Sequence, residues 1–280
     1  MKRLALTLIL TTGWAVAGIY YKAETTTVGD QKAQNSEMVV EAWVEGPKAR
    51  IEIVESDNPM AGQGSYIVTK DGGKNLFLVN PKDKTYMEWN MDQLLQMAGA
   101  MMEAMGGIVN FTFENVKTEK LAQGSGDNMF GHETDYYKYQ TSYDLQIKVM
   151  GMRRQQSVES IQEMWVTDNL RDLGLGIWLR NEPPSTGNEE LDHMIREQMK
   201  LVKGFPLRSK TVSTTRQWNK KRTKVRKQTT ATTITEVKEM REVAFKAGMA
   251  EVPAGYERVE MAGSNEGGNP FQGIFNRKKN

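Results

Sequence analysis

The sequence has no cysteine, only two histidines, and no apolar run as long as the roughly 20 residues of a membrane-spanning helix. Without cysteine the chain forms no disulfide, carries no cysteine nucleophile and cannot be a lipoprotein anchored through cysteine. His132 and His193 leave few candidates for base catalysis or metal binding. The motifs of serine hydrolases, zinc proteases and phosphate-binding loops are also absent, so the sequence indicates no reaction.

Residues 1–17, MKRLALTLILTTGWAVA, have the features of a secretory signal peptide. Lys2 and Arg3 form a basic start, an apolar stretch follows, and an Ala-Val-Ala sequence at 15–17 is typical of a cleavage site. We therefore expect a bacterial periplasmic protein. Removing Lys2 and Arg3 lowers the 37 basic residues to 35, equal to the 35 acidic residues. A neutral mature chain gives little support to nucleic-acid binding.

Most of the remaining chain alternates apolar and polar residues with the period of a half-buried β-strand. Short polar turns such as residues 71–73, Asp-Gly-Gly, favour antiparallel hairpins over βαβ crossovers. In the clearest strand, residues 136–150, the apolar side chains from Tyr137 to Val149 share one face. The expected strands cover residues 19–28, 38–45, 49–54, 66–70, 76–79, 85–89, 136–150, 207–218 and 223–240.

Residues 91–107, MDQLLQMAGAMMEAMGG, follow the period of a helix instead, and five of these 17 residues are methionine. Asn90 is placed as an N-cap, and two glycines at 106–107 supply the end. Three interpretations stay open: the methionines fill an ordinary core, cover a cavity for an apolar ligand, or bind a soft metal such as Cu(I). A second amphipathic helix is expected at residues 188–202.

Three segments carry a resemblance to known proteins: LFLVNPKDKTYMEW (76–89), GFPLRSKTV (204–212) and ITEVKEMREVAFKAGMAEVPAGYERVEM (234–261). They resemble motifs of a family of uncharacterised exported bacterial proteins and, in their order, the LolA-like superfamily of periplasmic lipoprotein carriers. The resemblance covers most of residues 18–262, and the chain departs from it in its long hairpin rich in threonine and lysine and at 151–184. It implies an α+β fold, in which a strongly curved antiparallel β-sheet forms an unclosed half-barrel and helices cover its concave face. It implies a cavity for acyl chains, and no reaction.

We therefore expect a signal peptide at 1–17, a single LolA-like β-rich domain at 18–262 and a disordered tail at 263–280. The predicted function is non-enzymatic binding, without a cofactor, of a hydrophobic small molecule, a lipid or the acyl chain of a lipoprotein, between the sheet and the methionine-rich helix. The alternatives are a structural or stress-related envelope protein that docks other proteins without a ligand, and copper binding through methionine. The candidate ligand-binding residues are Trp43, Phe77, Met97, Met101, Met102, Met105, Phe111, Phe113, Tyr137, Tyr139, Tyr143 and Trp165.

Basic residues are concentrated at 220–227. In a cytosolic protein such a run suggests nucleic-acid contact, but the leader favours a solvated β-ribbon or transient contact with an anionic membrane surface. The candidate membrane-contact residues are Lys220, Lys221, Arg222, Lys224 and Arg226. No metal site is predicted, because the neighbours of His132 suit a turn and those of His193 suit a solvated helix face.

Overall fold

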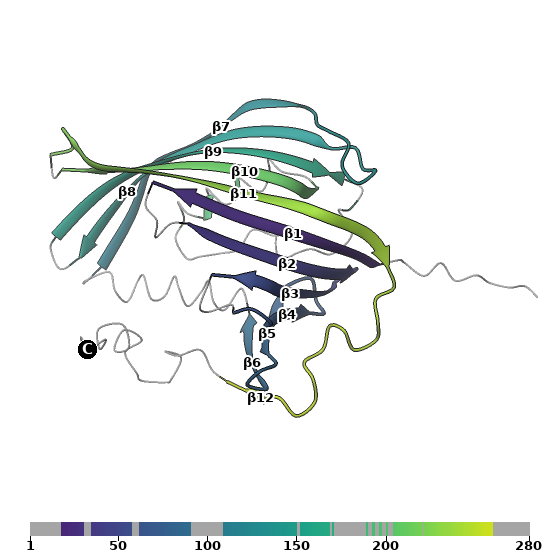
Figure 1. Cartoon of the computed structure of the whole chain (residues 1–280). Coiled ribbons are helices and arrows are strands. Elements are labelled where there is room, and N and C mark those ends of the chain that lie inside the picture. The colour runs from purple at the N-terminus through teal and green to yellow at the C-terminus, as the bar shows by residue number, and fades with distance from the viewer. Residues whose placement is uncertain are drawn as a thin grey trace, which may run out of the picture.

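The computed structural model consists of strands that lie in one sheet (Figure 1). It describes residues 18–30, 35–57, 62–90, 109–149, 152–168, 204–219 and 221–259, and single positions from 170 to 200. The strands are β1 (Gly18–Gly29), β2 (Ser36–Glu45), β3 (Lys48–Ser56), β4 (Tyr66–Thr69), β5 (Asn75–Asn80), β6 (Thr85–Asn90), β7 (Val109–Ser125), β8 (Asp135–Val149), β9 (Met152–Thr167), β10 (Phe205–Trp218), β11 (Val225–Val243) and β12 (Glu257–Arg258).

The 12 strands are ordered β12-β6-β5-β4-β3-β2-β1-β11-β10-β9-β8-β7, so β12 and β7 are separate edges and the sheet is not closed. Neighbours pair antiparallel except β12, which runs parallel to β6. β1 joins the two halves of the sheet, because it pairs with β2 on one side and with β11 on the other. Figure 1 shows a strong bend between β7 and β6, and a ribbon of β10 and β11 that projects past its neighbours.

The predicted α+β class with helices over a concave face is wrong for the described residues, which are almost entirely strand. Among them, α-helical backbone occurs only at isolated positions between Glu189 and Lys200, and no helix covers the sheet. The strands β7 and β9 form from two long segments in which no strand was predicted. Extended chain therefore occupies much of the sequence that was not assigned to strands. Within the described residues, no helix combines the length and the apolar character needed to cross a bilayer. The methionine-rich segment 91–107 lies outside the described residues.

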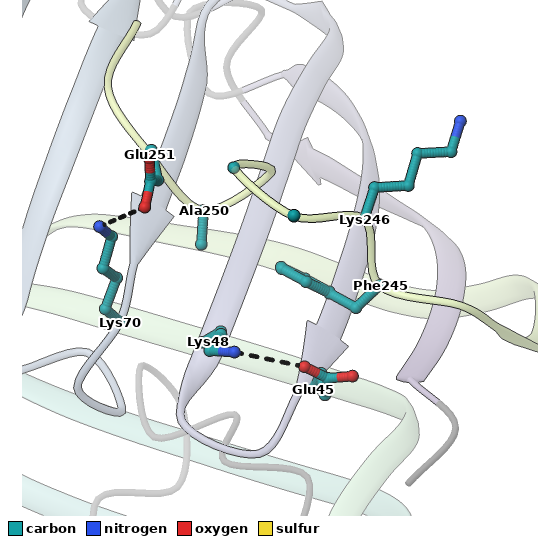
Figure 2. Close-up of a pocket in the computed structure, with 9 residues that line it drawn as sticks. Glu45, Lys48, Lys70, Phe245, Lys246, Ala250 and Glu251 are labelled. Atoms are coloured by element: carbon teal, nitrogen blue, oxygen red, sulfur yellow. Dashed lines mark hydrogen bonds and ion pairs between the residues drawn. The ribbon is translucent and has the colours of Figure 1, made fainter. Parts of the chain in front are cut away.

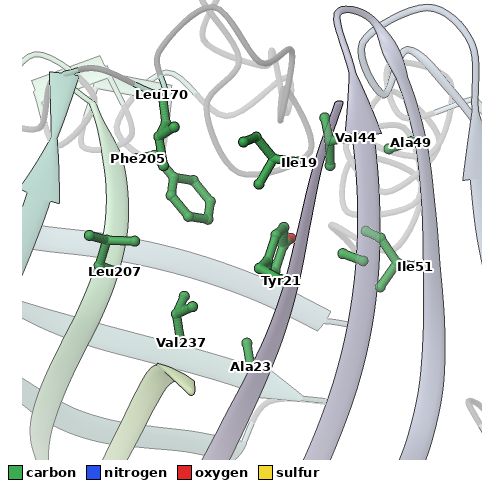
Figure 3. Packing of buried hydrophobic residues seen from close by; sticks show 11 residues of the cluster. Ile19, Tyr21, Ala23, Val44, Ala49, Ile51, Leu170, Phe205, Leu207 and Val237 are labelled. Atoms are coloured by element: carbon green, nitrogen blue, oxygen red, sulfur yellow. The ribbon is translucent and has the colours of Figure 1, made fainter. Parts of the chain in front are cut away.

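The main core lies on one face of the sheet, around β1. Leu207 is 0 % exposed, and it lies at a β-bulge in the pairing of β10 with β9. Tyr21 packs against Phe205 with ring centroids 5.5 Å apart. The cluster in Figure 3 comprises Ile19, Tyr21, Ala23, Ala42, Val44, Ala49, Ile51, Leu170, Phe205, Leu207 and Val237.

A smaller core contains Tyr66, Val68 and Val79, at positions that alternate with those of the main core. Val252 and Tyr256, from the segment that follows β11, pack against it. This segment continues into β12, whose pairing with β6 returns the chain to the edge of the sheet. The C-terminal part of the described chain therefore covers part of the face opposite the main core.

Candidate functional site

The sheet separates its charged side chains from its uncharged ones. Residues directly opposite each other in neighbouring strands point to the same face, so the register assigns each residue to a face. We name the face that carries Tyr21, Tyr139 and Thr211 the uncharged face, and the other the charged face. Among the described residues of β8, β9, β10, β11, β1 and β2, the charged side chains on the uncharged face are confined to strand ends: Asp135, Arg154, Lys227 and Glu242.

The charged face of the same strands carries ion pairs. Lys138 lies 2.9 Å from Glu163, and Arg216 lies 3.1 Å from Glu159. The hydrogen bond from Lys138 holds the pKa of Glu163 below its ordinary value. Charged groups need water or a partner, so this face is suited to solvent.

The uncharged face is deeply buried near the start of β8. Tyr137, Tyr139, Met164 and Val166 form one cluster there, and Tyr139 is only 4 % exposed. Burial raises the pKa of Tyr139, with the neighbouring Tyr137 as a second cause, and burial also raises the pKa of Tyr21 and Tyr143. Phenols are neutral at physiological pH at their ordinary pKa, and burial moves the pKa further from that range, so these tyrosines add no charge to the face.

The middle of the uncharged face is lined by hydroxyl groups that bond to each other. Thr25 and Thr235 are joined by a hydrogen bond of 3.0 Å between their hydroxyl oxygens, and so are Thr27 and Thr233. Ser160 donates to Ser213 across β9 and β10, also at 3.0 Å. Because each of these hydroxyls has a partner in the protein, the strip is polar without requiring charge or ordered water.

Toward the turn between β8 and β9 the uncharged face becomes apolar again but is less buried. Phe113 and Tyr143 lie with their ring centroids 5.8 Å apart and tilted by 54°. Leu145 and Ile147 follow on the same face of β8 and are half-buried. This end of the face is therefore the part where an apolar ligand can reach apolar side chains.

Five predicted ligand-binding residues lie at positions of the uncharged face. Tyr137, Tyr139, Tyr143 and Phe113 do so with described side chains, and Phe111 is opposite Ile147 in the backbone register. The structure thus brings these predicted residues together along β7 and β8. The five fall on one face because they occupy alternate positions of paired strands.

Three other predicted residues lie on the charged face instead. Their ring partners are Tyr20 for Trp43 at 5.3 Å, Tyr86 for Phe77 at 6.2 Å, and Tyr136 for Trp165 at 5.0 Å between centroids. Trp165 also has the Arg208 guanidinium 4.9 Å from its ring centroid. The structure therefore does not bring Trp43, Phe77 and Trp165 together with the tyrosines of β8.

The remaining predicted residues have other outcomes. Four of them, Met97, Met101, Met102 and Met105, lie outside the described residues, so the structure does not test copper binding through methionine. Lys220 also lies outside the described residues. Lys221, Arg222, Lys224 and Arg226 are exposed on the β10–β11 hairpin, and Arg222 forms an ion pair with Asp144. In the described part of the chain, no group of three or more His, Cys, Asp or Glu side chains is placed to hold a metal ion.

The hydroxyl strip was missed from the sequence, although a signal for it was present. In β10, the charged residues Arg208, Lys210 and Arg216 occupy one set of alternate positions, and the other set has no charge. The alternation is one of charge rather than of hydropathy, because serine and threonine are not apolar. Searching for a period of two in charge alone would have found the uncharged face in this strand.

A pocket of about 120 Å³ lies where the β2–β3 turn meets the segment after β11 (Figure 2). Two ion pairs border it, Lys48 with Glu45 at 3.5 Å and Lys70 with Glu251 at 2.8 Å. Its volume is below the roughly 300–1,000 Å³ of small-molecule sites. Its small size and charged border make it unsuitable for an apolar ligand.

No family model matches the chain, and no curated protein matches it. Solved structures similar to it include an uncharacterised conserved protein from Thermus thermophilus, with 9% identity over 88% of this chain and 91% of that chain and a TM-score of 0.35. A domain from Vibrio parahaemolyticus named for outer membrane lipoprotein sorting has 9% identity over 85% and 91%, with a TM-score of 0.28. A DUF1329 family protein from Desulfovibrio piger has 10% identity over 84% and 90%, with a TM-score of 0.31.

The expected similarity to a lipoprotein-sorting protein is thus found among solved structures. Identities of 9–10% and TM-scores of 0.28–0.35 do not establish a common fold or a common function. The function of this chain therefore has to be inferred from its own residues.

Proposed function

We propose that this chain is an exported, periplasmic, non-enzymatic protein that binds an apolar ligand, a lipid or the acyl chain of a lipoprotein, along the uncharged face of its sheet. The observation that carries the proposal is the length of that face. In β8 it carries only uncharged side chains from the buried Tyr139 to the half-buried Leu145 and Ile147, and Arg154 of β9, opposite Ile147, marks its end. The leader-like residues 1–17 support export.

Binding would be driven by burial of the ligand rather than by specific polar recognition. At about 0.8 kcal/mol for each buried methylene, ten methylenes gain about 8 kcal/mol, part of which is offset by the ordering of ligand and side chains. Half-buried apolar side chains such as Phe113 and Leu145 provide contact without a charge that would have to be desolvated. The paired hydroxyls of Ser160 and Ser213 can lie beside an acyl chain because their polar atoms are already bonded.

A matched pair of lysine substitutions in β10 tests the proposal. Thr211 and Thr214 are both half-buried threonines, but Thr211 lies on the uncharged face and Thr214 on the charged face. We expect Thr211→Lys to weaken binding of a fluorescent fatty acid at least about tenfold, because a charge would have to be desolvated beside the ligand. Thr214→Lys should bind as the unsubstituted protein does.

Circular dichroism and a cooperative unfolding transition serve as the control that both variants fold. Equal loss of binding in Thr211→Lys and Thr214→Lys would contradict the assignment of the site to one face. The absence of any uptake by the unsubstituted protein, together with no lipid in an organic extract of the protein from its own host, would contradict the proposed function itself.

A further inference from the structure

Two neighbouring hairpin ends form a basic patch at one end of the sheet. None of its members has an ion-pair partner among the described residues, and all are exposed. We name this group the basic end. It consists of Lys148, Arg153 and Arg154 from the β8–β9 hairpin and Lys221, Lys224, Arg226 and Lys227 from the β10–β11 hairpin.

Side-chain contacts hold the two hairpin ends side by side. Arg222, in the β10–β11 turn, forms an ion pair with Asp144 of β8, so it reaches across the intervening β9. Burial alone would raise the pKa of Asp144, but hydrogen bonds from Arg222 and Asn115 lower it. Trp218 donates its indole N–H to Ser157 in β9. Arg222 thus has a structural role, and the cations of the basic end have no such ion pair among the described residues.

The basic end contains a pair of like charges that repel each other. Lys148 and Arg153 are directly opposite each other in the β8–β9 register. Like charges in such positions destabilise a β-hairpin, and neither residue has an ion pair in the described chain to offset the repulsion. An anionic partner outside the chain would offset it.

The neighbours of these cations favour a membrane over a nucleic acid. Met152, at the β8–β9 turn, is 65 % exposed and places an apolar side chain among the charges. The half-buried Leu145 and Ile147 begin a few residues away on the uncharged face. Trp218 is half-buried and hydrogen-bonded, so it is not a free platform for stacking bases.

We infer that the basic end rests on an anionic membrane surface and that lipid passes there between the membrane and the uncharged face. The inference rests on the proposed function for its second part. Each basic residue close to an anionic leaflet contributes attraction, and screening by salt weakens that attraction. An exposed methionine and an accessible apolar surface next to the cations would contact the acyl region.

Binding to vesicles of phosphatidylcholine with phosphatidylserine, and to vesicles of phosphatidylcholine alone, tests the inference. We expect binding to the anionic vesicles only, and weaker binding as salt is added. Reversing three cations of the basic end that do not lie on the uncharged face, by Lys148→Glu, Arg153→Glu and Lys221→Glu, should weaken binding about a hundredfold. The matched control reverses three exposed lysines elsewhere, by Lys74→Glu, Lys82→Glu and Lys246→Glu, and should leave binding within about twofold of the unsubstituted protein.

Equal binding to both kinds of vesicle would contradict the basic end as a membrane-docking surface. An equal loss of vesicle binding in the two triple variants would contradict it as well. The protein could instead bind single-stranded RNA more tightly than anionic vesicles and lose that binding in the same triple variant. That result would identify a nucleic acid rather than a membrane as the partner of the basic end. Uptake of free fluorescent fatty acid should be the same in the first triple variant and the unsubstituted protein. Vesicle binding by a protein that takes up no fatty acid would support docking and overturn the proposed function.

Discussion

Two leucine-to-alanine substitutions on the uncharged face should separate the part that holds the fold from the part that holds the ligand. Leu207 is 0 % exposed within the main core, so Leu207→Ala should leave a cavity and lower the free energy of unfolding by about 2–5 kcal/mol. Leu145 is half-buried, so Leu145→Ala removes fewer contacts and leaves a space that solvent can enter. We expect about 1 kcal/mol for Leu145→Ala.

Urea unfolding with and without a fatty acid measures both effects. A ligand at a hundred times its dissociation constant stabilises the folded state by about 2.7 kcal/mol. If Leu145→Ala weakens binding tenfold, added ligand stabilises this variant by about 1.4 kcal/mol less than it stabilises the unsubstituted protein. The difference in the free energy of unfolding between the two proteins then widens by that amount. The deficit of Leu207→Ala should be the same in both conditions. Leu145→Ala could instead lower the free energy of unfolding as much as Leu207→Ala does, with no change when ligand is added. That result would refute the division of the face into a part that holds the fold and a part that holds the ligand.

Two further predictions concern interactions on the two faces. The lowered pKa of Glu163 makes its bond with Lys138 stabilising at pH values above 4.5. Urea unfolding at a series of pH values measures the free energy of unfolding of the unsubstituted protein and of Glu163→Gln. The higher value of the unsubstituted protein should fall to that of the variant as the pH falls through the lowered pKa. A difference that persists in acid would contradict this. On the uncharged face, Thr25→Val and Thr235→Val should each cost about 1 kcal/mol, and the double variant should cost less than their sum. Strict additivity in unfolding measurements would show that the threonine pair is not coupled.

Strands with one wet and one dry side could be predicted from the sequence. Residues 136–150 were expected as a strand and form β8, Asp135–Val149, with Tyr137 and Tyr139 buried on one face. The strand expected at 207–218 forms β10, Phe205–Trp218. In both, alternate positions differ strongly in charge or hydropathy, so the period of two was visible.

The strands β7 and β9 could not be predicted in the same way. In β9, polar residues occur on both faces: Gln156, Ser160 and Gln162 on one, Glu159 and Glu163 on the other. Hydropathy therefore shows no clear period, although charge does. β7 lies at the edge of the sheet and contains two register shifts in its pairing with β8, which interrupt the period of two.

The aromatic type of a residue does not decide which face of the sheet it occupies. Trp165 lies between Met164 and Val166, which are buried on the uncharged face, so alternation alone assigns Trp165 to the other face. Trp43 likewise lies between Ala42 and Val44 of the main core. The position relative to buried neighbours would have placed both residues on the charged face.

The extent of the uncharged face favours the proposed ligand binding over a purely structural role. A sheet that only needs to bury a core can carry charge on both faces beyond that core, as β11 does near its hairpin, where neighbouring Arg226 and Lys227 point to opposite faces. β8 keeps Leu145 and Ile147 apolar on one face up to the last pairs before its turn, while Lys148 is exposed on the other. Partly exposed leucine and isoleucine beyond the buried tyrosines contribute little to stability, and a bound acyl chain gives them a role that a filled core does not.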